Sequence, residues 1–146
     1  MEQVLRDEVL GRIGCHARGV TYVVPITYVF SGSSIVGHTG DGLKVRMMRE
    51  NPVVCFEVEQ LQGTSNWRTV IVFGRFEELA GEIADAALEN LRWRLRELAR
   101  KQGSAPAEGL GLWVPGSDAT RARESIVFAI RVEKLSGRYQ FLEGPR

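Results

Sequence analysis

The chain has 146 residues, with 19 Lys and Arg against 18 Asp and Glu, and 44% of its residues are hydrophobic. This length predicts a single domain, 1–146, with its own core. A formal net charge of +1 excludes a broad basic surface for nucleic acid. The composition also excludes disorder as the main state.

The sequence also bears on location and metal content. No apolar run approaches the roughly 20 residues of a membrane span, and acidic residues stand near the start where a signal peptide carries basic ones. Cys15 and Cys55 have neither metal-ligand spacing nor a disulfide framework. We therefore expect a cytoplasmic protein with two buried thiols, no membrane partner and no metal.

Alternating apolar residues predict six strands, at 9–16, 20–30, 34–39, 53–59, 67–79 and 124–135. The segment 20–30, VTYVVPITYVF, carries the strongest strand pattern. Pro25 in its middle cannot donate to a ladder, so it marks an edge, a bulge or a break where free backbone groups could bind a ligand. Gly74 predicts a bulge in the long strand 67–79.

Two helices are predicted, a short one at 41–50 that Asp41 can cap, and a longer one at 82–101. Residues 103–121 form a long Gly- and Pro-rich loop, and 136–146 form a tail. Strands dominate and neither helix makes a clear parallel crossover. The pattern predicts a mainly β fold, a small antiparallel barrel with helices at its ends.

The segment 38–44, HTGDGLK, joins a strand end to a glycine-rich turn and a helix start. The first N–H groups of a helix have no partner within it and carry a partial positive charge, so they suit an anion. Lys44, one turn into the helix, adds a point charge for a phosphate. An ordinary capped helix with an exposed lysine is the alternative.

Trp67, Arg68 and Thr69 open the long strand 67–79. An indole, a guanidinium and a hydroxyl at a strand entry suit a planar, phosphorylated ligand. The alternative is a core tryptophan beside a solvated arginine.

The ordered string of motifs resembles the pyridoxamine 5′-phosphate oxidase-like, flavin-binding split-barrel superfamily. It reads VVPITYVF at 23–30, GHT at 37–39, Gly42-x-Lys44, NPVVCFEV at 51–58 and RTVIVFGR at 68–75. VEKLSGR at 132–138 is similar to the closing strand of the nitroimidazole-resistance branch, which the chain resembles most. The resemblance covers residues 9–80 and 124–139.

The resemblance implies a six-stranded antiparallel split barrel that forms a homodimer, with FMN bound at the subunit interface. It implies that 24–27 meet the flavin ring, that the segment 38–44 holds the phosphate end, and that the start of the strand 67–79 also approaches the flavin. The implied cofactor-binding residues are Val24, Pro25, Ile26, Thr27, His38, Thr39, Lys44, Trp67, Arg68 and Thr69.

The implied function is that of an FMN-dependent oxidoreductase that reduces a small nitro-aromatic or quinone-like acceptor. His38 is the candidate catalytic residue, as a proton donor near the ring. A non-catalytic flavin- or haem-binding protein is the alternative, with His38 as a haem ligand, and deazaflavin is another cofactor of the superfamily. Gly37 replaces the usual bulky residue and predicts extra space beside the ring. Residues 103–123 match no part of the resemblance, so their role stays open.

Overall fold

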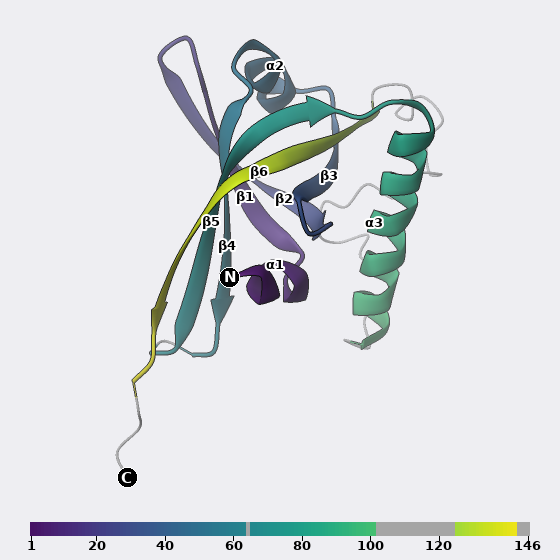
Figure 1. The fold of residues 1–146 in the computed structure, drawn as a ribbon. Coiled ribbons are helices and arrows are strands. Elements are labelled where there is room, and N and C mark those ends of the chain that lie inside the picture. The colour runs from purple at the N-terminus through teal and green to yellow at the C-terminus, as the bar shows by residue number, and fades with distance from the viewer. Residues whose placement is uncertain (64, 102–124, 143–146) are drawn as a thin grey trace.

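The computed structural model describes residues 1–63, 65–101 and 125–142, and within them six antiparallel strands close into a barrel in the order β1-β2-β3-β6-β5-β4 (Figure 1). This confirms the predicted mainly β, six-stranded fold. The strands are β1 (Leu10–Ala17), β2 (Val20–Phe30), β3 (Ser34–Gly40), β4 (Val53–Leu61), β5 (Trp67–Glu78) and β6 (Ser125–Gln140).

The core fills the barrel because successive side chains of a strand point to opposite faces. On β4, for example, Val54, Phe56 and Val58 are buried, whereas Val53 and Glu59 are exposed. The ring of Tyr28 meets that of Phe56 edge-on, with 4.8 Å between the centroids. The largest fully buried side chains include Tyr28, Phe56, Phe128, Ile13, Ile35 and Ile130.

In the part of the chain that the structure describes, three helices surround the barrel: α1 (Glu2–Asp7), α2 (Leu43–Glu50) and α3 (Gly81–Lys101). Figure 1 shows α2 at one end of the barrel, α1 toward the other, and α3 along one side. The short α1 was not predicted. It buries Val4 and Leu5 at its end of the barrel, where the Tyr28 hydroxyl donates a hydrogen bond of 3.0 Å to the Leu5 carbonyl. Leu91 of α3 packs on the outer sides of β2 and β3.

The longest pairing joins β5 to β6, and a register shift lies at Phe73 and Gly74. The extra residue of this bulge is Glu133 on β6, so the irregularity lies opposite Gly74 rather than in the strand 67–79 where it was predicted. A Cβ on Gly74 would lie 2.2 Å from the Arg131 carbonyl oxygen, so only glycine fits there. The prediction that a tail begins at residue 136 was wrong. Residues 136–140 are polar, and pairing with β5 keeps them in β6. The predicted loop 103–121 and the open role of 103–123 fall outside the described residues.

Candidate functional site at the β2–β3 seam

Two pairings of the barrel are short, with three Cα partners each: β1 pairs with β4 at Arg12–Gly14, and β2 pairs with β3 at Tyr28–Phe30. We call the β2–β3 junction the seam. Backbone polar groups alternate sides along a strand. The Tyr28 N–H donates to Val9 at 2.9 Å, on the β1 side. It follows that Val23, Pro25 and Thr27 turn their backbone groups toward β3. No strand in the described ranges pairs with β2 at Val23 and Pro25, so the carbonyls of these two residues line the open seam.

Pro25 therefore stands on an edge, which is one of the alternatives that its sequence position left open. Its side chain is exposed, and its Cα partner on the other side is Arg12 of β1. The missing N–H would have pointed into the seam, so the β1–β2 ladder loses no hydrogen bond. Of the predicted flavin-contacting residues 24–27, Val24 and Ile26 turn their side chains inward, whereas Thr27 turns outward beside the seam.

His38 lies on β3 across the seam, on the outer side that α3 covers. Its Nε2 hydrogen-bonds the Ser125 hydroxyl at the start of β6. Burial lowers the pKa of His38, and the positive charge of Arg92 on α3 lowers it further. The imidazole is therefore neutral at pH 7. The next residue, Thr39, is buried and points to the opposite face of the strand.

The N-terminus of α2 comes directly after β3 in the chain. The prediction that Asp41 caps this helix was wrong: the N-cap is Gly42, no side chain bonds the first turn, and the Asp41 carboxylate instead pairs with Arg49 at 3.0 Å. A Cβ on Gly40 or Gly42 would meet nothing within 4 Å, so the backbone is open on this side. The first N–H groups of α2 are therefore available to an anion.

Lys44 is half-buried in the first turn of α2 and forms no ion pair with any described residue. Burial lowers its pKa, against the weaker opposing effect of the nearby Cys15 thiol. Both cysteines are free, and Cys15 is buried in the barrel, whereas Cys55 is only half-buried on its outer side. A half-buried ammonium without a carboxylate beside an uncapped helix N-terminus suits an anionic ligand.

The expectation that Gly37 leaves space beside a cofactor was wrong. Gly37 is buried and faces the inside of the barrel, where a Cβ would lie 2.6 Å from the ring of Phe128. The glycine accommodates an aromatic core residue rather than a ligand.

Trp67, Arg68 and Thr69 lie far from the seam within one chain. They begin β5 and pair with Gln140, Tyr139 and Arg138, whereas His38 pairs with Val127 near the other end of β6. The Thr69 hydroxyl is engaged with Glu57, at 2.9 Å. The structure thus brings 24–27 and 38–44 together around the seam and leaves 67–69 at the opposite end of the barrel.

Sequence reasoning missed Ser125 and Arg92 as neighbours of His38. Ser125 is 87 positions away in the chain, and Arg92 is one of several arginines on α3, so no local pattern singled out either residue. Within the described ranges there is no cluster of three or more potential metal ligands, and no helix long and apolar enough to cross a membrane.

The comparisons with known proteins agree with this architecture. A model of the pyridoxamine 5′-phosphate oxidase family matches residues 1–139. The chain therefore belongs to this family. It is 29% identical, over 88% of its length and 83% of the relative's, to the uncharacterized protein RA0666 of Rhizobium meliloti (strain 1021).

Solved structures of other proteins are also similar to this chain. A FAD-binding protein of Mesorhizobium loti shares 28% identity and a TM-score of 0.70, over 97% of this chain and 91% of that one. A proposed 5-nitroimidazole antibiotic resistance protein of Bacteroides thetaiotaomicron shares 16% identity and a TM-score of 0.64, over 94% and 81% of the two chains. The second likeness concerns the fold alone.

Proposed function

We propose that the chain binds FMN at the β2–β3 seam and serves as an oxidoreductase for a small nitro-aromatic or quinone-like acceptor. The observation that carries the proposal is the seam itself, an unpaired strand edge beside an uncapped helix N-terminus and the half-buried Lys44. Membership of the family and the likeness to a FAD-binding protein at 28% identity support a flavin as the ligand.

The residues present fit such a cofactor. Lys44 and the first N–H groups of α2 hold the phosphate, because together they offer a cation and unpaired donors. The backbone at Val23 and Pro25 offers hydrogen-bonding groups along the seam to the polar edge of a planar ring. When bound, a flavin supplies hydride and electron chemistry, and the protein binds and orients it.

His38 is proposed to hydrogen-bond the cofactor or the acceptor in its neutral form. Ser125 orients the imidazole through its hydrogen bond to Nε2, and the lowered pKa favours the neutral ring at pH 7. A neutral imidazole is also the form that binds haem iron. The haem-binding alternative therefore predicts a different spectrum for the same residue.

We further propose that two copies of the chain associate through the outer face of β2, β1, β4 and β5. A row of Cα partners crosses these strands at Val23, Gly14, Cys55 and Phe73. Val23 is 59% exposed and Phe73 is 42% exposed, although both are apolar. Gly14 adds no side chain to this row, and a Cβ there would lie 2.7 Å from the Cys55 sulfur. Such an apolar strip on a sheet face suits burial against a second copy.

This association also gives the start of β5 a place in the site. Within one chain, residues 67–69 are too far from the seam to contact a ligand there. If they approach a flavin as the family resemblance implies, they approach the one bound at the seam of the second copy. The site is then complete only in the dimer.

A visible spectrum of the freshly purified protein, before and after addition of FMN, tests the proposed function. We expect flavin bands that co-elute with the protein, and chromatography of the released cofactor distinguishes FMN from FAD. Turnover with NADH or NADPH and a nitro-aromatic acceptor separates an oxidoreductase from a flavin store. A haem Soret band, or a colourless protein that does not bind added FMN, would contradict the proposal.

The dimer has its own test. Phe73→Asp places a charge in the apolar row and should give a monomer in sedimentation velocity. Arg75→Asp, two residues further on the same exposed face of β5, is the matched control and should leave the dimer intact. A dimer that survives Phe73→Asp would show that the association uses another face.

A further inference from the structure

A line of polar contacts crosses β1, β4 and β5 on the outer face of the barrel, beside the apolar row that the proposed dimer buries. Nη1 of Arg12 donates to Oε2 of Glu57 at 3.3 Å and to Oε1 of Glu59 at 3.0 Å. Oε1 of Glu57 accepts a hydrogen bond of 2.9 Å from the Thr69 hydroxyl. We call these four residues the outer-face cluster, and they belong to three different strands.

The strand register explains why these side chains meet. Arg12 and Glu57 are Cα partners, and so are Glu59 and Thr69. Residues two positions apart on a strand share one face, and a long side chain reaches the diagonal neighbour on the next strand. Glu57 therefore reaches Thr69 as well as Arg12, and it links β1 to β5, which are not neighbours in the barrel.

These contacts fix the direction in which the Thr69 hydroxyl donates its proton. A hydroxyl has one proton and two lone pairs, whereas a carboxylate paired with a guanidinium only accepts. The carbonyl of Val58, 3.2 Å from the same hydroxyl, also only accepts. The single proton is therefore held within the chain, by Glu57 at the shorter distance. A ligand that approaches Thr69 meets a lone pair.

The outer-face cluster adjoins the surface that the second copy covers. Glu57 stands two residues beyond Cys55 of the apolar row, on the same face of β4. Its side chain is 32% exposed, and that of Arg12 is 48% exposed. Because a second copy on this face excludes water, the contacts of Glu57 become stronger in the dimer.

We propose that Glu57, held by Arg12, is a positioning residue that presents Thr69 as a hydrogen-bond acceptor to the flavin of the second copy. The proposal rests on the proposed function, in which the start of β5 approaches the flavin at the seam of that copy. Apart from its phosphate, FMN has hydrogen-bond donors of two kinds, the ring N3–H and the ribityl hydroxyls. Thr69 accepts from one of them, whereas Glu57 acts only through Thr69.

A double-mutant cycle on FMN affinity tests this role. Glu57→Gln keeps the shape of the side chain, but Arg12 retains the amide oxygen, so the NH2 group faces Thr69 and the hydroxyl proton turns elsewhere. We expect the FMN dissociation constant to rise about three- to tenfold, the range for one hydrogen bond. In a Thr69→Val background the same change should have no further effect, because the hydroxyl is absent. Thr69→Ser, which keeps the hydroxyl, should keep the effect.

Glu59→Gln is the matched control. Glu59 also binds Arg12 and is the Cα partner of Thr69, whereas the Thr69 hydroxyl donates to Glu57. Glu59→Gln should leave the FMN affinity unchanged. Both variants should sediment as dimers, which separates positioning from a loss of the interface. The analogue 3-methyl-FMN lacks the ring N3–H and identifies the donor. Equal affinity for the original protein and Thr69→Val assigns the ring N3–H, and a loss as large as that for FMN assigns a ribityl hydroxyl.

The outcomes distinguish this proposal from the proposed function. Equal losses of FMN affinity in Glu57→Gln and Glu59→Gln would overturn the positioning role and leave the flavin site in place. The same holds for a Glu57→Gln effect that persists in the Thr69→Val background, or for FMN binding that Thr69→Val does not change. An original protein that binds no FMN would contradict both proposals.

Discussion

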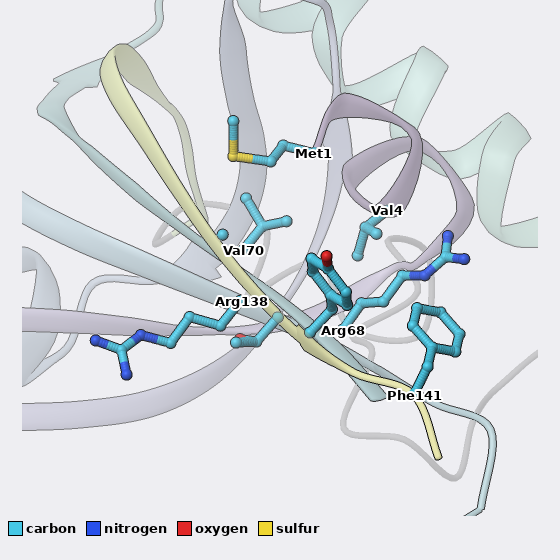
Figure 2. Close-up of a pocket in the computed structure, with 9 residues that line it drawn as sticks. Met1, Val4, Arg68, Val70, Arg138 and Phe141 are labelled. Atoms are coloured by element: carbon cyan, nitrogen blue, oxygen red, sulfur yellow. The ribbon is translucent and has the colours of Figure 1, made fainter. Parts of the chain in front are cut away.

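The two ends of this barrel offer ligands different kinds of group. At the seam the available groups belong mainly to the backbone, namely the free edge of β2 and the first turn of α2, with Lys44 as the added charge. In the cavity between α1 and the ends of β5 and β6 they are side chains, chiefly Arg68, Tyr139 and Phe141 (Figure 2). Recognition at the seam therefore depends on where strand pairing stops. Recognition at the other end depends on which side chains the strand alternation turns to one face.

The largest effect should come from the seam. Lys44→Ala removes the half-buried ammonium, and we expect it to raise the FMN dissociation constant about 10- to 100-fold, the range for a hydrogen bond to a charged group. Quenching of flavin fluorescence measures this constant. Arg46→Ala, on the same helix but exposed, is the control and should have little effect. Equal dissociation constants for the two variants would contradict a phosphate site at Lys44.

A smaller effect is expected at the end of the barrel that α1 covers. Tyr28→Phe removes the donor to the buried Leu5 carbonyl and should lower the free energy of unfolding by about 1–2 kcal/mol. Urea denaturation measures the change. Tyr139→Phe, at a largely exposed tyrosine, is the control and should stay within about 0.5 kcal/mol. A cost for Tyr139→Phe as large as that for Tyr28→Phe would mean that the Tyr139 hydroxyl also stabilises the fold.

The smallest effect concerns the proton equilibrium of His38. Burial and Arg92 hold its pKa below the ordinary value. Unfolding therefore takes up a proton between the folded pKa and about 6.5. Because the unfolded state binds more protons in this window, the contribution of His38 lowers the free energy of unfolding as the pH falls through it.

Arg92→Gln removes one of these two causes. We expect the pKa of His38 to rise and the loss of stability in acid to shrink. NMR titration of the ring, assigned with His38→Gln, measures the pKa directly. An unchanged pKa would show that burial alone sets it and that Arg92 does not act on the seam.

Much of the fold was predictable because it depends on local patterns. Alternation located all six strands, and helical spacing located α2 and α3. The misses have physical causes. The helix α1 is only six residues long, too short to show a helical period. The end of β6 is polar and is held in the sheet by its partner strand, an effect of tertiary pairing.

The candidate site was predictable where its residues are close in sequence. The segment 38–44 carried its own signal, and Pro25 signalled an interrupted ladder. The contact of His38 with Ser125 lies at one end of the pairing between β3 and β6, two strands that are distant in sequence, so no spacing reveals it. Trp67–Thr69 were grouped with the seam by family resemblance. The register of β5 and β6 places them at the other end of the same chain.

The unpaired edge of β2 has a consequence for solubility. A free row of backbone donors and acceptors is a template on which a strand of another molecule can pair, and such edges lead to aggregation. Pro25 interrupts that row, because it offers no N–H to an incoming strand. The free edge of β2 therefore stays open to a small molecule, whereas a strand of another molecule pairs with it poorly.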